Sequence, residues 1–220
     1  MTILLDSASL DDAAAAARLA YVGGFSTNPL LMARETGEPL AHFARLLKAF
    51  PRGPAFYQPA GPSPEALTAE ARAAAHLEPD RVVVKLPATA DGVAAAATLV
   101  AEGVRCALTA AYAPAHALLA HETGCAWVIP YVDRATRQGV DGLALVAALE
   151  ATLARLQSTT RVLAASLKTP AQLVEAVLRG GRDVTAPLAV LHALPDHPLS
   201  GAAAHEFATA AGSGTTPAAR

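Results

Sequence analysis

Short apolar segments alternate along the chain with longer segments rich in alanine and leucine. Several of the short segments are continuous apolar runs rather than strict alternations, which is typical of strands that are covered on both faces. We predict strands at residues 2–6, 22–26, 54–58, 82–85, 105–109, 126–132, 161–166 and 183–186. Short strands that are joined by helical segments in this way indicate a parallel sheet.

The longer segments predict the helices that connect these strands. Ser63-Pro64 and Thr169-Pro170 each fit a capping residue followed by a proline at the first helical position. Gly180 stands where a helix would end. The predicted helices cover residues 10–21, 39–50, 64–77, 92–102, 114–122, 142–157, 170–179, 188–194 and 198–211.

Eight strand–helix units within 220 residues predict an α/β fold, a (β/α)8 TIM barrel. We expect a single domain over residues 1–211, including a C-terminal helix, and a flexible tail at 212–220, which is rich in Gly, Ser, Thr and Pro. An open doubly wound sheet is the alternative. That fold favours a glycine-rich phosphate turn after the first strand, and neither this turn nor a P-loop pattern occurs in the sequence.

The composition narrows the class of protein. With 53% hydrophobic and 16% charged residues, the chain can bury a large core. A net charge of −2 without a basic block argues against nucleic acid as a partner. The two cysteines lack metal or disulfide spacing, the N-terminus turns acidic too early for a signal peptide, and no apolar run is long enough for a membrane span. We therefore expect a cytoplasmic protein without membrane contact. The histidines form no ligand pattern, so we expect neither a metal nor a cofactor.

Polar residues follow the predicted strands at the same end, although each strand is otherwise apolar. In a barrel of this kind the carboxyl ends of the strands form the active site. A shared polar end is not needed for stability, so it predicts a substrate pocket. The residues at or just beyond these ends are Asp6, Ser26, Thr27, Asn28, Gln58, Lys85, Thr109, Tyr131, Asp133, Arg134, Ser166 and Lys168.

Lys85 ends the apolar segment RVVVKLPATADG at residues 81–92. An ion-paired or snorkelling lysine is one interpretation. A lysine at the mouth of a central strand is instead desolvated, which lowers its pKa. The neutral amine attacks carbonyl groups, so the second interpretation is Schiff-base chemistry.

Five segments of the chain resemble the transaldolase family, and most of all its fructose-6-phosphate aldolase branch. They are LLDS at 4–7, STNP at 26–29, VVVKLPAT at 82–89, YVDR at 131–134 and AASLKTP at 164–170. The similarity runs from the first strand to about residue 200, with matching order and spacing. The resemblance implies the barrel fold, and it implies that Lys85 forms the Schiff base with a ketone.

The resemblance also implies roles for the surrounding residues. Asp6 and the T-N-P motif, with Thr27 and Asn28, bind substrate hydroxyls. Gln58, Thr109 and Tyr131 hold a water that carries protons to and from the substrate. Transaldolases have Glu and Phe at the places of Gln58 and Tyr131, so these two residues favour direct aldolase activity.

Arg134 and Ser166 match positions that bind the substrate phosphate, and Lys168 either adds charge there or is a solvated residue at a helix start. Two residues depart from the family pattern. Asp133 lies next to Arg134 in the sequence and either weakens phosphate binding or faces away. Ile129 replaces a small residue on the sixth strand, so we expect a narrower range of donors.

The leading hypothesis is a metal-free class I aldolase. It would cleave fructose 6-phosphate to dihydroxyacetone and glyceraldehyde 3-phosphate, or catalyse a similar aldol reaction. A transaldolase and a non-catalytic barrel that binds sugar phosphates are the alternatives. In the family the C-terminal helix reaches a neighbouring subunit, so the resemblance implies a homo-oligomer, a pentamer or a decamer.

Overall fold

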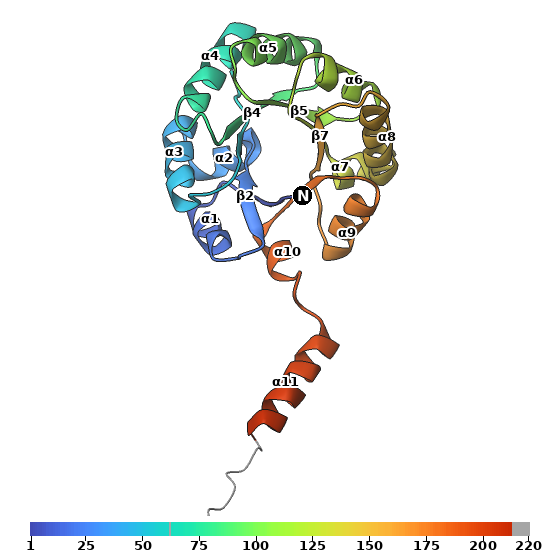
Figure 1. The fold of residues 1–220 in the computed structure, drawn as a ribbon. Coiled ribbons are helices and arrows are strands. Elements are labelled where there is room, and N and C mark those ends of the chain that lie inside the picture. The colour runs from blue at the N-terminus through green and yellow to red at the C-terminus, as the bar shows by residue number, and fades with distance from the viewer. Residues whose placement is uncertain (62, 213–220) are drawn as a thin grey trace, which may run out of the picture.

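The strands form a closed barrel in the computed structural model, which describes residues 1–61 and 63–212 (Figure 1). Each strand pairs in parallel with the next along the chain, and β8 closes the ring by pairing with β1. The predicted (β/α)8 barrel is confirmed. The strands are β1 (Ile3–Asp6), β2 (Val22–Ser26), β3 (Ala55–Tyr57), β4 (Val82–Pro87), β5 (Cys106–Ala111), β6 (Trp127–Pro130), β7 (Arg161–Ala164) and β8 (Asp183–Ala186).

Helices surround the barrel, except for the last helix of the chain, which extends away from it (Figure 1). They are α1 (Leu10–Ala17), α2 (Pro29–Glu35), α3 (Pro39–Ala49), α4 (Pro64–Ala75), α5 (Ala90–Ala101), α6 (Ala115–Glu122), α7 (Val132–Arg137), α8 (Gly142–Arg155), α9 (Pro170–Leu178), α10 (Leu188–His192) and α11 (Pro198–Gly212). The side chains of Ser63 and Thr169 accept backbone hydrogen bonds and cap α4 and α9, as the sequence predicts.

The short helices α2 and α7 were not predicted, and both lie at the carboxyl ends of strands. Helix α2 begins because Asn28 Oδ1 accepts hydrogen bonds from the amides of Leu30 and Leu31, while Pro29 stands at the first helical position. Helix α7 begins at Val132, so the strand predicted at 126–132 was too long.

The strand predicted at 161–166 was also too long. Strand β7 ends at Ala164, and Ser166 adopts a φ of 61°, in the left-handed region. A residue in this conformation cannot continue a strand, so the chain turns there. Ser166 and Tyr131 therefore stand on the turns that follow the strands, where their side chains reach the barrel mouth.

Two apolar clusters fill the structure. The larger cluster lies between the strands and the helices and includes Val82, Val84 and Leu86 of β4. The smaller cluster fills the barrel interior with Leu4, Phe56, Val83, Ala107, Ile129, Leu163 and Ala165. Because side chains alternate along a strand, Lys85 faces the same side as Val83, which is the interior. The interior cluster thus forms a packed base beneath Lys85.

A buried carboxylate ties strands together at the opposite end of the barrel. Asp183 begins β8 and is 2% exposed. It accepts hydrogen bonds from the Thr2 amide at 2.7 Å, from Trp127 Nε1 at 2.9 Å and from two nitrogens of Arg161 at 2.7 Å each. Four donors compensate the desolvation of this charge. The network joins the beginnings of β1, β6, β7 and β8.

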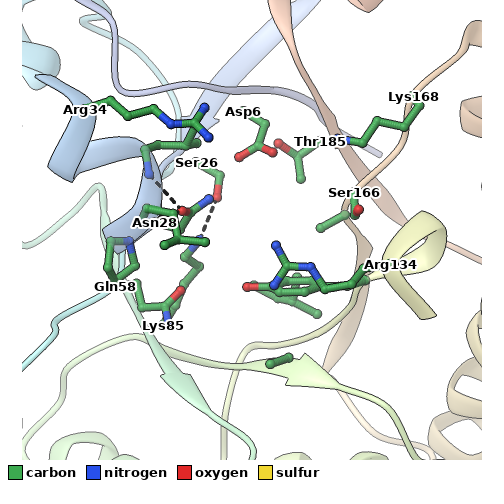
Figure 2. Close-up of a pocket in the computed structure, with 17 residues that line it drawn as sticks. Asp6, Ser26, Asn28, Arg34, Gln58, Lys85, Arg134, Ser166, Lys168 and Thr185 are labelled. Carbon is green, nitrogen blue, oxygen red and sulfur yellow. Dashed lines mark hydrogen bonds between the residues drawn. The ribbon is translucent and has the colours of Figure 1, made fainter. Parts of the chain in front are cut away.

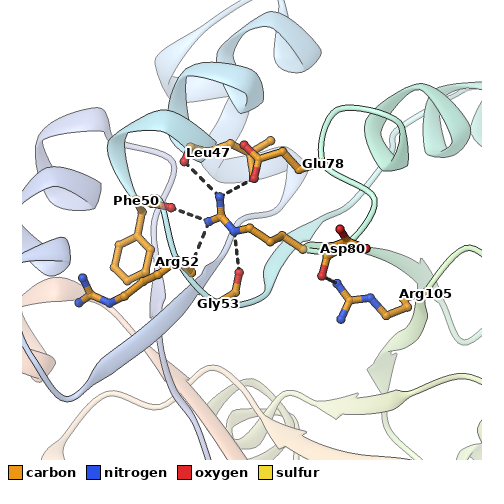
Figure 3. A network of polar contacts seen from close by, with 8 residues as sticks. Leu47, Phe50, Arg52, Gly53, Glu78, Asp80 and Arg105 are labelled. Carbon is orange, nitrogen blue, oxygen red and sulfur yellow. Dashed lines mark hydrogen bonds and ion pairs between the residues drawn. The ribbon is translucent and has the colours of Figure 1, made fainter.

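Arg81 holds the segment that leads into β3 against the start of β4 through hydrogen bonds, and Figure 3 labels its partners Phe50, Arg52, Gly53 and Glu78. Its guanidinium donates to the carbonyls of Phe50 at 2.6 Å, Gly53 at 2.9 Å and Arg52 at 3.1 Å. Glu78 Oε2 pairs with the same guanidinium at 2.5 Å. These contacts anchor the N-terminal end of β3, and Gln58 follows the C-terminal end of the same strand.

Helix α11 extends away from the barrel (Figure 1), and its Leu199 and Phe207 are exposed. The helix ends at Gly212, which is the first residue of the predicted tail. The rest of that tail, 213–220, lies outside the described residues. No helix within the described part of the chain is long and apolar enough to cross a membrane.

Candidate active site

A cavity of about 390 Å³ opens at the carboxyl ends of the strands (Figure 2). It brings together nine of the residues that the sequence places at the polar strand ends: Asp6, Ser26, Asn28, Gln58, Lys85, Tyr131, Arg134, Ser166 and Lys168. Thr27 and Thr109 are fully buried and are not among its lining residues. The predicted pocket therefore exists, and the two threonines lie behind its wall.

Lys85 is 3% exposed and lies in the barrel interior. Its Nζ donates a hydrogen bond to Ser26 Oγ at 3.1 Å, and no carboxylate of the described residues forms an ion pair with it. Burial lowers the pKa of Lys85 to about 8, and the attraction of Asp6 opposes this shift only in part. The amine is therefore neutral in a sizeable fraction of molecules near neutral pH.

Asp6 stands at the end of β1, and its carboxyl group is directed into the cavity (Figure 2). Burial raises its pKa, while Lys85, Lys168 and Arg134 favour the charged form. Asp6 is thus the carboxyl group whose charged form these three cationic side chains stabilise. It can accept or donate a proton, or it can bind a hydroxyl group.

Tyr131 and Thr109 form a hydrogen-bonded pair beside the cavity. The Thr109 hydroxyl donates to the Tyr131 hydroxyl oxygen at 3.0 Å, which leaves the phenolic proton free to be donated elsewhere. Burial raises the pKa of Tyr131, and the Thr109 hydrogen bond opposes the shift in part. Tyr131 is therefore a protonated donor at neutral pH. Its ring packs edge-on against Tyr112, with centroids 6.0 Å apart.

Gln58 follows β3, and its Oε1 is buried without a hydrogen-bond partner among the described residues. A carboxamide oxygen in this state is ready to accept a hydrogen bond from a water or a ligand. Glu70 of α4 holds the chain on both sides of Gln58. Its Oε1 accepts from the Tyr57 hydroxyl, and its Oε2 accepts from the Ala60 amide at 3.1 Å.

Asn28 has a structural role as well as a place in the cavity wall. Its Oδ1 caps α2, so the amide nitrogen is the part of the side chain that remains for a ligand. Thr27 differs, because its hydroxyl oxygen is buried and has no hydrogen-bond partner among the described residues. The structure places Thr27 behind the wall, where a ligand in the cavity does not reach it directly.

Arg134, Ser166 and Lys168 lie on the β6–β7 side of the mouth (Figure 2). The Arg134 guanidinium carbon lies 5.0 Å from the centroid of the Tyr131 ring. Asp133 does not line the cavity and pairs instead with Arg137 at 2.9 Å. Of the two possibilities left open by the sequence, the structure favours the one in which Asp133 faces away.

Sequence reasoning missed Arg34 and Thr185 as members of the site, and it gave no role to Ser26, whose hydroxyl accepts the hydrogen bond from Lys85. Arg34 lines the cavity from α2, and its side chain extends toward the centre (Figure 2). Thr185 Oγ1 is buried and unpaired among the described residues. Only the Asn28-Pro29 cap gave a signal for Arg34, because it marks the start of the helix that carries this side chain.

The arrangement combines a desolvated amine, proton donors and acceptors, and positive charges at one opening. An amine of this kind can condense with a ketone, and Tyr131, Asp6 and Gln58 line the same cavity with groups that can donate or accept hydrogen bonds. The described residues contain no group of three or more His, Cys, Asp or Glu side chains that could hold a metal ion.

Comparison with known proteins identifies close sequence relatives. Residues 60–216 match the model of the family described as Transaldolase/Fructose-6-phosphate aldolase. A protein from Roseiflexus sp. (strain RS-1), named "Probable transaldolase", is 36% identical over 200 residues, which cover 91% of this chain and 92% of that relative. A protein of the same name from Symbiobacterium thermophilum is 33% identical over 207 residues, covering 94% and 95%.

Solved structures share the fold at low sequence identity. A mandelate oxidase variant matches with a TM-score of 0.62 and 15% identity, covering 91% of this chain and 68% of the oxidase. A flavocytochrome b2 variant matches with a TM-score of 0.63 and 9% identity, covering 86% and 56%. At such identities the likeness concerns the barrel fold alone.

Proposed function

Because the chain belongs to the Transaldolase/Fructose-6-phosphate aldolase family, we propose that it is a class I aldolase in which Lys85 forms a Schiff base with a ketose. The main support is the state of Lys85. It is buried in the barrel interior, its pKa is lowered to about 8, and its hydrogen-bond partner is a neutral hydroxyl. The family membership makes the protein an enzyme of the aldolase or transaldolase type.

The shift in pKa decides how much reactive amine is present. With a pKa of about 8, roughly a tenth of Lys85 is neutral at pH 7. At the ordinary value of about 10.5 the neutral fraction would be roughly 0.03%. The burial therefore increases the reactive form about three-hundredfold.

The proposed cleavage begins when Lys85 Nζ attacks the C2 ketone of fructose 6-phosphate. The ketone oxygen leaves as water after accepting protons, and a protonated imine remains between Nζ and C2. The C3–C4 bond then breaks as the C4 hydroxyl loses its proton and the bonding electrons enter the imine, giving an enamine. Protonation of C3 and hydrolysis release dihydroxyacetone, after glyceraldehyde 3-phosphate has left.

Tyr131 and Gln58 would move protons through a bound water in these steps. Tyr131 keeps its proton at neutral pH and offers it into the cavity, because Thr109 supplies the other hydrogen bond to its hydroxyl. Gln58 Oε1 has no partner among the described residues and would accept from the same water. Asp6 and Asn28 line the same cavity and would bind the hydroxyls of the donor end.

Arg134, Ser166 and Lys168 would hold the phosphate of the substrate. Arginine suits this group through its fork of donors, and lysine adds a point charge. Asp133 does not compete, because it pairs with Arg137. A phosphorylated acceptor end therefore fits the side of the mouth formed by β6 and β7.

A transaldolase remains the second candidate, and the names of the relatives favour it. Gln58 and Tyr131 favour the aldolase. The two activities are separated by incubating the enzyme with fructose 6-phosphate, with and without erythrose 4-phosphate, and measuring free dihydroxyacetone. Release without the acceptor supports the aldolase, whereas transfer without release supports the transaldolase. A protein with neither activity would be a non-catalytic binding barrel.

We also propose that the protein is a cytoplasmic homo-oligomer, a pentamer or a decamer, assembled through its C-terminal helix. Helix α11 extends from the barrel and has exposed Leu199 and Phe207, which fits a helix that packs on another subunit. Light scattering of the full chain, compared with a Leu199→Glu/Phe207→Glu variant, tests this proposal. The variant should yield smaller particles, and an unchanged mass would contradict it.

A further inference from the structure

The mouth of the cavity carries more positive charge than is needed to bind one phosphate group on its β6–β7 side. Arg34, Arg134 and Lys168 line it together with Lys85. Among the described residues that line the cavity, Asp6 is the acidic one. The chain as a whole has a net charge of −2, so this excess is local to the site.

These three outer cations lack carboxylate partners within the described part of the chain, whereas some arginines elsewhere are paired. Arg72 pairs with Glu102 at 2.6 Å, and Arg182 pairs with Glu150 at 2.7 Å. Asp133, the residue next to Arg134, pairs with Arg137 instead. Arg34 has neither an ion pair nor a side-chain hydrogen bond in the described structure. The unpaired guanidinium is available to an anion in the cavity.

Arg34 and Arg134 approach the cavity from opposite sides. Arg34 lies on α2, which follows β2, and Arg134 lies on α7, which follows β6. In the closed order of the eight strands, β2 and β6 are opposite each other. Figure 2 shows both guanidinium groups directed inward from opposite sides. Lys85 on β4 and Asp6 on β1 stand between them in the ring.

We infer that Arg34 binds a second anionic group of the substrate, at the end opposite the group that Arg134, Ser166 and Lys168 bind. The substrate class is then an acyclic ketose with an anionic group at each end, such as a ketose 1,6-bisphosphate. This inference rests on the proposed function, because it assumes that Lys85 reacts at C2 between the two ends. Asn28 caps helix α2, which carries Arg34. The residue proposed to bind the donor hydroxyls therefore also fixes the start of the helix that holds the second anion site.

The test compares cleavage of fructose 1,6-bisphosphate and fructose 6-phosphate, measured as glyceraldehyde 3-phosphate formed from either. The variants are Arg34→Gln and, as a matched control for the loss of one exposed arginine, Arg155→Gln on α8. We expect the wild-type kcat/KM for the bisphosphate to equal or exceed that for the 6-phosphate. In Arg34→Gln the loss of a charge-assisted contact should lower the ratio of kcat/KM for the bisphosphate to kcat/KM for the 6-phosphate about tenfold. The ratio should stay within about twofold in Arg155→Gln.

A binding measurement separates this inference from the proposed function. In a Lys85→Met background, calorimetry should show bisphosphate binding that weakens about tenfold when Arg34→Gln is added. An unchanged ratio in Arg34→Gln, or wild-type turnover of the 6-phosphate without turnover of the bisphosphate, would overturn the inference and leave the aldolase intact. Absence of turnover and of any Lys85 adduct with either ketose would overturn both.

Discussion

Lys85 Nζ donates its hydrogen bond to the Ser26 hydroxyl, 3.1 Å away, rather than to a carboxylate. A neutral partner does not compensate the charge of a buried ammonium group as an anion would. The pKa of Lys85 is therefore lowered by burial, to about 8, with only partial opposition from Asp6. The low pKa follows from the inward direction of Lys85 within β4, since the side chains of this strand alternate between the helices and the barrel interior.

The lowered pKa predicts a cost in stability that depends on pH. Near pH 7 the Lys85 amine is protonated in the unfolded chain, whereas burial in the native state disfavours its charged form. Folding therefore carries a free-energy cost at this residue, and Lys85→Met should be more stable than the wild type. A shift of this size corresponds to about 3 kcal/mol. The unfolded state binds more protons between pH 8 and 10.5, so wild-type stability should rise there and the gap should close. Urea unfolding of both proteins from pH 7 to 10.5 checks this, and a constant gap would argue against a lowered pKa.

Tyr131→Phe should slow cleavage without preventing attachment of the ketone to Lys85. Removal of a proton donor lowers kcat by about 10²-fold or more. Tyr112→Phe is the matched control, because it also removes a hydroxyl but keeps the edge-on ring contact with Tyr131. Steady-state kinetics combined with reductive trapping measure both effects. Equal losses in the two variants would mean that Tyr131 acts only by packing.

Glu70 is predicted to be a positioning residue that acts through Gln58. Glu70→Ala removes the acceptor for the Tyr57 hydroxyl and for the Ala60 amide, which hold the chain on either side of Gln58. We expect kcat to fall about tenfold, since small misplacements of catalytic groups are costly.

The effect should vanish in a Gln58→Ala background, where there is no carboxamide left to position. Glu70→Gln, which keeps one acceptor oxygen, should restore part of the activity. If Glu70→Ala lowers kcat by the same factor with and without Gln58, the two residues act independently, and the assigned role of Glu70 is wrong.

Asp183→Ala should destabilise the barrel strongly because it leaves Arg161, Trp127 Nε1 and the Thr2 amide without their acceptor. Removing one partner of a buried ion pair costs about 3–5 kcal/mol. Asp133→Ala is the control, since its partner Arg137 is exposed and such pairs contribute about 0–1 kcal/mol. Urea unfolding measures both losses, and a similar small loss for each would contradict the role given to the Asp183 network.

Much of the fold and of the cavity followed from the sequence, for a physical reason. The apolar strands repeat eight times and seven of them have polar ends, and parallel strands in a closed barrel place those ends together. The inward direction of Lys85 follows from the two-residue period of a strand, because Val83 faces the interior and Val84 faces the helices. These features depend only on local periodicity and on the barrel closing.

The features that the sequence did not predict depend on short helices at the barrel mouth. Helix α2 spans Pro29–Glu35 and is too short to give a clear helical period, so the inward direction of Arg34 could not be read from the sequence. Helix α7 has the same effect on Asp133, because only helical geometry brings it to Arg137, four residues later. Thr27 lies behind the cavity wall for a different reason, because the direction of its side chain depends on the strand register.

The central claim is that Lys85 condenses with a ketone. The chain contains three lysines, at positions 48, 85 and 168, so the modified residue can be identified without ambiguity. The most direct measurement is borohydride trapping with dihydroxyacetone at pH 6 to 9, followed by peptide mass spectrometry. We predict one adduct on Lys85, forming faster as the pH rises toward about 8 and absent from Lys85→Met. An adduct on Lys168 or Lys48 instead, or none with any ketose, would contradict the account.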